Sequence, residues 1–485
     1  MKTQQHHRST LLCLILILGL TLISNAQTQK GDDIDGEAAY DRSGISVSMP
    51  DDNTVAIGAI YNNDGGAFAG HVRIYEWNGS AWAQKGSDID GEAENDQSGY
   101  SVSMPDASTV AIGAPYNDGN GTDSGHVRIY TWNGSAWAQK GSDIDGETAN
   151  NYSGFAVSMP DANTVAIGAY LNNNDGGFQA GHVRIYMWNG SSWIPKGDDI
   201  DGDAAYDHFG YFVSMPDADI VAIGAPDSNA VNGNFSGYVR IYAWDSGTSS
   251  WEPKGNVFNG TYFSRTGLSV SMPDANTVGF GAPFYANGNY GQVRVFYWDG
   301  DSWELKGSDI YGGYGTYTGL SVSMPDVNTL AIGASNFARI YTWSGSAWVL
   351  NSSIIGEEVG DKFGSSVSMS DANTVAIGAS ENDGSDTESG HVRIYTGFSL
   401  GIEENDIGLA IVSYPNPTDG KLTIDLKNGF IHAVVVVRNI LGQEVARHVY
   451  NSTDRIQLGI PQKAGMYMIE VNADGRKALL KVIKK

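Results

Sequence analysis

Short apolar runs separated by turn-forming dipeptides fill most of this chain, and no helical period appears between them. One pattern, Ser-Val-Ser-Met-Pro-Asp-Ala-Asn-Thr-Val-Ala-Ile-Gly-Ala-Pro or a close variant, recurs almost to residue 400. Its first valine stands at Val47, Val102, Val157, Val213, Val270, Val322 and Val367, in steps of 55, 55, 56, 57, 52 and 45 residues. A repeat of this length is typical of β-propellers and solenoids.

Each copy of the repeat contains four β-rich runs, separated by Pro-Asp, Asn-Asp-Gly and Asn-Gly turn signals, which predicts four antiparallel strands. Two tryptophans bracket the Asn-Gly turn, as Trp77 and Trp82 do in the first copy. Such residues face each other across a hairpin, and their regular recurrence favours a structural role over sugar stacking. The aspartates of the Pro-Asp turns, such as Asp106, are interpreted as turn formers.

The two ends of the array predict a closed ring. The seventh copy stops after Tyr395, without its tryptophan hairpin or fourth strand, whereas residues 29–36 read as a fourth strand with no copy before them. Pairing of these segments removes the open edges of a solenoid. The fold class predicted is therefore all-β: a seven-bladed β-propeller over residues 27–397, followed by a small immunoglobulin-like β-sandwich.

The N-terminal segment has the pattern of a secretory signal peptide. Lys2 and Arg8 precede the apolar run Leu11–Ile23, and small residues lead to a cleavage site between Ala26 and Gln27. Residues 1–26 are predicted to be removed, and with them the single cysteine, which excludes disulfides and thiol chemistry. No later stretch is long and apolar enough to cross a membrane as a helix.

Acidic residues dominate the propeller segment. The chain carries a formal charge of −26, and residues 27–397 hold 16 basic against 46 acidic side chains. Such a surface repels phosphate backbones, so nucleic acid is excluded as a partner. Only Arg42, Arg265 and Lys362 fall outside the repeated basic positions, and all three lie between a fourth and a first strand.

The repeat resembles the FG-GAP repeat of integrin-α-type propellers. The similarity rests on the Val-Ala-Ile-Gly-Ala-Pro and Gly-His-Val-Arg-Ile-Tyr runs and on the opening pairs Phe209-Gly210 and Phe363-Gly364. The family often carries an aspartate-rich calcium loop between the first two strands. Here that connection is Met104-Pro105-Asp106-Ala107-Ser108-Thr109 and its equivalents, with one carboxylate, so calcium binding is not carried over and no cofactor is expected.

Strand order places all the variable loops on one face of the propeller, where recognition is expected. The ligand-binding residues predicted there are Tyr40, Tyr116, Tyr206, His208, Tyr262, Arg265, Tyr290 and Tyr314. No catalytic residues are assigned, because no carboxylate pair or activated nucleophile is confined to one blade. Four recurring histidines, His71, His126, His182 and His391, are interpreted as structural, since equivalent residues of radiating blades diverge and cannot form one zinc cluster.

The tail differs from the repeats in composition. After a linker at residues 398–408, residues 409–485 resemble the type A sorting domain of the Bacteroidetes type IX secretion system. The residues that carry this resemblance are Pro415, Asn416, Pro417, Gly420, Gly442, Gly465, Tyr467, Lys481, Lys484 and Lys485. The resemblance implies a sandwich that addresses the chain to the secretion machinery, with the protein then released or attached to the cell surface.

These observations predict a secreted or surface-attached, monomeric and non-catalytic propeller that binds a glycan or a protein in adhesion or matrix interaction. One alternative is a polysaccharide hydrolase or lyase on the same scaffold, which would require acids converging near one blade. Another is an envelope structural protein with no specific ligand.

Overall fold

The computed structural model describes residues 27–229, 232–398, 412–414, 418–439, 444–460, 463, 465–473 and 476–485. The predicted signal peptide, its Ala26 boundary residue and nearly all of the predicted linker lie outside these residues. The chain divides into two compact units, Met1–Phe398 and Ser399–Lys485. All the regular elements described are β-strands.

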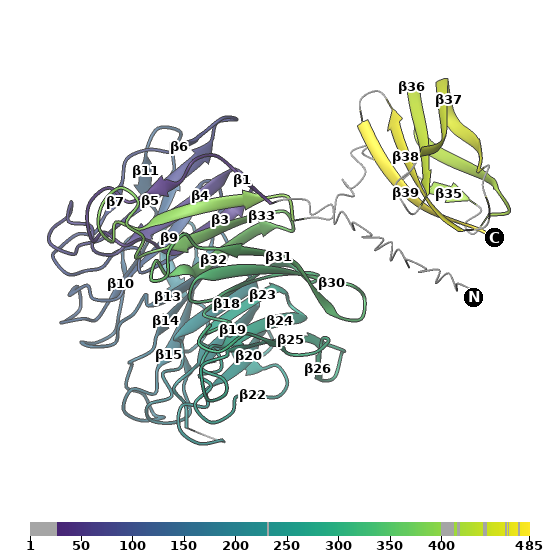
Figure 1. Cartoon of the computed structure of the whole chain (residues 1–485). Coiled ribbons are helices and arrows are strands. Elements are labelled where there is room, and N and C mark those ends of the chain that lie inside the picture. Colours follow the sequence, from purple (N-terminus) through teal and green to yellow (C-terminus); the bar gives the residue numbers. More distant parts are fainter. Residues whose placement is uncertain are drawn as a thin grey trace, which may run out of the picture. The chain divides into compact units, whose positions relative to one another are not determined.

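In the first unit, seven antiparallel sheets follow one another along the chain (Figure 1). The first sheet holds β3 (Ser43–Asp51), β4 (Thr54–Ala59), β5 (His71–Trp77), β6 (Trp82–Gln84) and β7 (Ile89–Asp90). The second holds β8 (Ser101–Asp106), β9 (Thr109–Ala114), β10 (His126–Trp132), β11 (Trp137–Gln139) and β12 (Ile144–Asp145). The third holds β13 (Ala156–Asp161), β14 (Thr164–Ala169), β15 (His182–Trp188), β16 (Trp193–Pro195) and β17 (Ile200–Asp201).

The remaining sheets repeat this order. The fourth holds β18 (Phe212–Asp217), β19 (Ile220–Ala225), β20 (Tyr238–Asp245), β21 (Ser250–Pro253) and β22 (Phe258–Asn259). The fifth holds β23 (Ser269–Asp274), β24 (Thr277–Ala282), β25 (Gln292–Trp298), β26 (Trp303–Leu305) and β27 (Ile310–Tyr311). The sixth holds β28 (Ser321–Asp326), β29 (Thr329–Gly333), β30 (Phe337–Trp343) and β31 (Trp348–Ile355).

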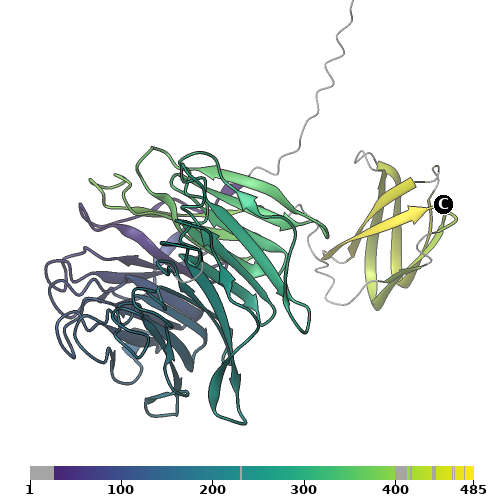
Figure 2. The same ribbon diagram turned by 90° about the horizontal axis from the view of Figure 1, so that it is seen from below.

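The last sheet joins both ends of the propeller segment. It contains β32 (Phe363–Asp371), β33 (Thr374–Ala379) and β34 (His391–Thr396), completed by β1 (Thr28–Gln29) and β2 (Ile34–Asp35), which both pair with β34. Purple β3 consequently lies beside green β32 and β33 (Figure 1; Figure 2 shows the same sheets from below). The all-β propeller class predicted from the sequence is confirmed.

A ring of hydrogen bonds explains why the Ser-Met pair recurs. The backbone N–H of the methionine in each inner strand donates to the serine Oγ of the preceding inner strand, at 2.9–3.0 Å. Met104 donates to Ser48 in this way, and Met49 donates to Ser368 of the last sheet. The seven bonds therefore link all seven sheets in a closed circle.

The tryptophan hairpins connect neighbouring sheets through hydrogen bonds. The rings of Trp132 and Trp137 lie 5.5 Å apart across their hairpin, and Trp137 Nε1 donates to the carbonyl of Lys85 in the preceding sheet at 2.7 Å. Equivalent bonds at 2.6–2.8 Å occur at six junctions. At the seventh junction, which has no such hairpin, Ser352 Oγ donates to Gln27 Oε1 at 2.8 Å. The structural role predicted for these tryptophans is thus evident.

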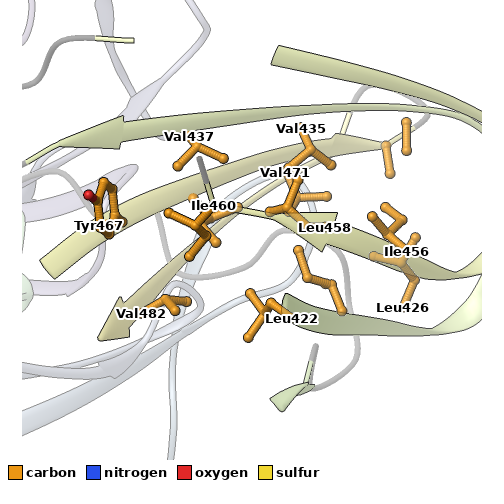
Figure 3. Close-up of a cluster of buried hydrophobic side chains, with 14 residues drawn as sticks. Leu422, Leu426, Val435, Val437, Ile456, Leu458, Ile460, Tyr467, Val471 and Val482 are labelled. Atoms are coloured by element: carbon orange, nitrogen blue, oxygen red, sulfur yellow. The ribbon is translucent and has the colours of Figure 1, made fainter. Parts of the chain in front are cut away.

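The second unit is one five-stranded sheet around its own apolar core. It contains β35 (Val412–Tyr414), β36 (Lys421–Asn439), β37 (Glu444–Gly459), β38 (Gly465–Ala473) and β39 (Arg476–Lys484). The long β36 pairs with β35 through its first part and with β38 through its last, and its pairing with β37 is irregular between Asp425 and Phe430. Figure 3 shows side chains from both parts of β36 meeting β37, β38 and β39 in the buried cluster.

Candidate functional site: the mouth of the central channel

The inner strands of all seven sheets line a central cavity of about 270 Å³. At the end where these strands begin, one residue per sheet lines the cavity. This channel ring consists of Ile45, Tyr100, Phe155, Tyr211, Leu268, Leu320 and Ser365. The lining is mostly aliphatic on one side and aromatic on the other, so the seven-fold repeat produces an asymmetric site.

A second set of residues lies next to the channel ring, and all of its members share an unusual backbone conformation. Three residues before each member of the channel ring, the chain adopts a positive φ of 51–60° without using glycine. This mouth ring consists of Arg42, Gln97, Tyr152, His208, Arg265, Tyr317 and Lys362. The carbonyl of each accepts a hydrogen bond from the N–H of its channel-ring residue, as Tyr152 does from Phe155 at 3.2 Å.

The left-handed conformation is strained for side chains other than glycine and asparagine, and it recurs here in every sheet. The loop over the preceding strands holds it in place. The N–H of Arg265, for example, donates to the carbonyl of Phe235 at 2.9 Å. The mouth-ring side chains are therefore presented from a fixed frame, while their chemistry changes from sheet to sheet.

Aromatic rings form a continuous cluster across the second, third and fourth sheets. Phe155 lies at its centre, with ring centroids 4.6 Å from Tyr100, 4.3 Å from Tyr170 and 4.7 Å from Tyr211. Tyr152 extends the cluster, because its ring lies 5.9 Å from that of Tyr170. Aromatic pairs at such distances stabilise one another by roughly 0.5–1.5 kcal/mol beyond their buried area.

The tyrosine hydroxyls of this cluster stay protonated at neutral pH. Burial raises the pKa of Tyr100, of Tyr170 and of Tyr211, and neighbouring tyrosines add to the rise. Burial and then the Asp123 carboxylate raise the pKa of Tyr152 to about 12. These groups consequently act as neutral donors and acceptors of hydrogen bonds rather than as acids or bases.

Next to the rings, Asp227 joins two mouth-ring residues. Its Oδ2 lies 2.8 Å from His208 Nδ1, and its Oδ1 lies 3.1 Å from Arg265 Nε. The imidazole also packs edge-on against Tyr170, with ring centroids 5.5 Å apart. The Nε2 of His208 is buried without a hydrogen-bond partner among the described residues. The three groups form a partly charged edge to the aromatic cluster.

The structure brings together some of the predicted binding residues and separates the others. His208 and Arg265 meet at Asp227, and Tyr116 reaches the aromatic cluster through Tyr152, with ring centroids 5.0 Å apart. The remaining five are partly or largely exposed, and no ring contact joins them to the cluster among the described residues: Tyr40, Tyr206, Tyr262, Tyr290 and Tyr314. Their ring contacts are local, as between Tyr206 and Phe178 or between Tyr290 and Tyr314.

Five residues of this site are not among those predicted from the sequence: Tyr100, Tyr152, Phe155, Tyr170 and Tyr211. A signal was present in the repeat. The residue that follows the glycine of the Ser-Gly, Thr-Gly or Phe-Gly pair is isoleucine, tyrosine, phenylalanine, leucine or serine in different copies, although this glycine and the valine three residues after it are present in all seven. Variation at this single position of the repeat, and not variation in loop length, therefore marks the channel ring.

Models of known protein families match parts of both units. Residues 87–130 and 357–395 match the FG-GAP repeat, and residues 412–485 match the secretion system C-terminal sorting domain. The chain is thus an exported β-propeller with two segments that match the FG-GAP repeat. The sorting domain directs the chain to the cell surface or outside and implies an interaction with the type IX secretion machinery. Among the described residues, no helix of sufficient length and apolarity to cross a membrane occurs.

Two solved structures similar to this chain are described as lactonases. A putative 6-phosphogluconolactonase from Bacteroides uniformis is 8% identical with a TM-score of 0.46, covering 67% of this chain and 88% of its own. The periplasmic gluconolactonase of Pseudomonas aeruginosa is 12% identical with a TM-score of 0.45, covering 83% of this chain and 98% of its own. The search of curated proteins gives no match.

In the sorting domain, predicted motif residues from opposite ends of the unit meet. Lys484 Nζ donates to the carbonyl of Ile460 at 2.8 Å, and the N–H of Lys485 donates to the carbonyl of Thr418 at 2.9 Å. Gly420 has a φ of 114°, and a Cβ there would lie 3.0 Å from the Lys484 side chain. Tyr467 is buried and its hydroxyl donates to the carbonyl of Lys463 at 2.6 Å.

Other motif residues are less fully placed. Gly465 begins β38, and the backbone of Lys481 lies in β39. Pro415, Asn416, Pro417 and Gly442 lie outside the described residues.

Proposed function

We propose that this exported propeller is a non-catalytic binding module that takes the end of a neutral glycan in the mouth of its central channel. The observation that carries the proposal is the ring cluster around Phe155, because it combines apolar faces with tyrosine hydroxyls on one rigid frame. Sites for small ligands are typically concave and largely apolar, with a few fixed polar groups. Sugars present both apolar C–H faces and hydroxyls, which match this combination.

The size and charge of the site support a small neutral group rather than a polyanion. The cavity of about 270 Å³ is near the lower end of the range for ligand pockets. The propeller segment has a net charge near −30, which disfavours anionic ligands at long range. Arg265 is already paired with Asp227, so its positive charge is largely neutralised within the site.

A glycan array probed with the labelled exported protein, with and without calcium, tests the proposal. We expect Tyr152→Ala and Tyr170→Phe to weaken binding by about tenfold or more, since one lost hydrogen bond and its packing correspond to roughly 1–2 kcal/mol. Tyr314→Ala serves as the control, because that side chain is 79% exposed and outside the cluster. Binding that survives the first two substitutions and is lost with the third would overturn this location of the site.

Catalysis by a hydrolase or lyase is the competing function, and His208 beside Asp227 is the observation that favours it. A general base must reach the proton that it removes. Here Nδ1 is held by Asp227 and Nε2 is buried, so neither nitrogen is directed to the cavity in this conformation. Release of new reducing ends or unsaturated products from array-positive glycans, lost in His208→Ala, would establish the catalytic function instead.

A further inference from the structure

Four of the seven sheets contain a buried histidine facing two carboxylates. The three residues come from the connection that enters the sheet, from the first position of its third strand, and from the position before its short last strand. The groups are Glu37, His71 and Asp88; Glu92, His126 and Asp143; Glu147, His182 and Asp199; and Glu357, His391 and Asp33. The histidines do not converge with one another, but each has acids of its own.

The group in the first sheet is the most complete, because Asp64 from the β4–β5 connection joins it. One ligand atom from each of Glu37, Asp64, His71 and Asp88 lies within 4.8 Å of the other three. His71 Nδ1 lies 3.7 Å from Asp88 Oδ2 and 3.9 Å from Glu37 Oε2. These distances are too long for hydrogen bonds but suit atoms that share a central ion.

The imidazole itself lacks partners. His71 is fully buried, and both of its ring nitrogens have no hydrogen-bond partner among the described residues. Buried polar groups in native proteins are nearly always satisfied, and leaving one without a partner costs about 1–3 kcal/mol. An ion bound to Nδ1 would satisfy this nitrogen and separate the negative charges of three neighbouring carboxylates.

The seven copies of the repeat show that ion pairing with arginine does not by itself explain this arrangement. The basic residue nearby, Arg73 in the first sheet, has a counterpart in all seven copies. The histidine and the glutamate, in contrast, occur together or not at all. The fourth, fifth and sixth sheets replace the histidine with Tyr238, Gln292 and Phe337, and the glutamate with Asp203, Thr261 and Gly313. An arginine partner alone would not require a histidine wherever glutamate occurs.

We propose that Glu37, Asp64, His71 and Asp88 bind a divalent transition-metal ion of the Zn²⁺ type, with the three other histidine groups acting as weaker, three-ligand sites. A tetrahedral ion with bonds of about 2.1 Å keeps its ligand atoms roughly 3.4 Å apart, which rotation of the exposed Glu37 and Asp64 side chains allows. Imidazole nitrogen favours zinc over calcium, which takes oxygen ligands. Arg73 Nη1 lies 3.4 Å from Glu37 Oε1 and orients this ligand from the outside.

Such an ion would link the connection between β2 and β3 to the first sheet. Glu37 follows β2, which pairs in the last sheet, whereas His71 and Asp88 belong to the first sheet. The equivalent group of the last sheet contains Asp33, from the N-terminal closing segment, beside His391. Metal binding at these two positions therefore strengthens the junction at which the ring closes.

The test is calorimetric titration of untagged, chelator-stripped exported protein with ZnCl₂, together with the visible absorption of bound Co²⁺ as a report on tetrahedral coordination. We expect one tight site and up to three weaker ones, and a rise in Tm on adding Zn²⁺. His71→Gln copies Gln292 of the fifth sheet, and Asp64→Gly copies Gly119 of the second, so both changes are ones that this fold already accommodates.

His71→Gln should weaken the tight site by more than the roughly 10–100-fold that loss of an outer-shell partner costs. Asp64→Gly should reduce the affinity of the tight site to that of the weaker sites. His448→Gln, at an exposed histidine of the second unit, should leave all the sites unchanged.

A gain of a site can be tested as well. The double change Thr261→Glu and Gln292→His completes a group with Asp309 in the fifth sheet and should add one bound ion. Absence of Zn²⁺ binding, or a tight site unchanged in His71→Gln, would overturn the proposal.

Discussion

Closure of the ring by the N-terminal strands can be tested with a matched pair of substitutions. Ile34 in β2 and Ile89 in β7 occupy the same position of the repeat, and each is 5% exposed. Ile34 pairs with Val392 near the other end of the propeller segment, whereas Ile89 pairs with Val72 of its own sheet. The two side chains differ in one respect: Ile34 reaches its core only if the ring closes as the structure describes.

The expected loss of stability follows from burial. Replacing either isoleucine with alanine removes three carbon atoms, worth about 0.8 kcal/mol each in transfer from water. The cavity left behind raises the total to about 2–4 kcal/mol. Since Ile34 packs with Ile394 and Met49 in the same manner as Ile89 packs with Ile74 and Met104, the two losses should agree within about 1 kcal/mol.

Urea unfolding of the exported protein, followed by tryptophan fluorescence and circular dichroism, measures both variants under the same conditions. Equal decreases in the unfolding midpoint support a docked β2. If Ile34→Ala unfolds within about 0.5 kcal/mol of the parent while Ile89→Ala loses 2 kcal/mol or more, the closing segment is not part of the ring and the reasoning is refuted.

Three further outcomes are expected. Trp137→Phe should destabilise the propeller by about 1 kcal/mol more than Trp132→Phe, because only the first indole donates across the junction between sheets; equal midpoints in urea would contradict this clamp. Gly113→Ala should lower the Tm steeply, because the new Cβ would lie 2.0 Å from the carbonyl oxygen of Gly154, a backbone atom that cannot move aside as a flexible side chain could. A Tm within about one degree of that of the parent would show that the neighbouring sheets can move apart at this point without loss of stability. Deleting residues 412–485 should leave the propeller in the periplasm, which fractionation and immunoblotting would detect, and continued surface delivery would contradict the role of the sorting domain.

Local signals in the sequence were sufficient for the strands and their turns. The Pro-Asp pair predicts a turn at Asp106, for example, and its Oδ1 accepts a hydrogen bond from the N–H of Ser108 at 2.7 Å. Trp77 and Trp82 were expected to face each other and do so at 5.5 Å. These predictions succeeded because turn formation and hairpin pairing involve residues close together in the chain, whose energetics do not depend on the rest of the fold.

The residues of the proposed binding site are harder to predict because they are far apart in sequence. Tyr100, Phe155 and Tyr211 are separated by 55 and 56 residues and become neighbours only when successive sheets pack side by side. The prediction favoured long, tyrosine-bearing loops such as the one at Tyr314, whose side chain extends into solvent. Loop variability locates the face of a propeller, but proximity to its axis decides which residues converge on that face.

The sequence by itself determined the repeat, the strands within it, the closing segment at residues 29–36 and the sorting domain, since each depends on local patterning or on a motif. Tertiary structure alone decided the rest. It placed one residue per sheet around the channel through a repeated left-handed backbone, and it brought Glu37 to His71 across a junction between sheets. Both arrangements depend on packing between repeats, and the pattern within a single repeat carries no information about its neighbours' orientation.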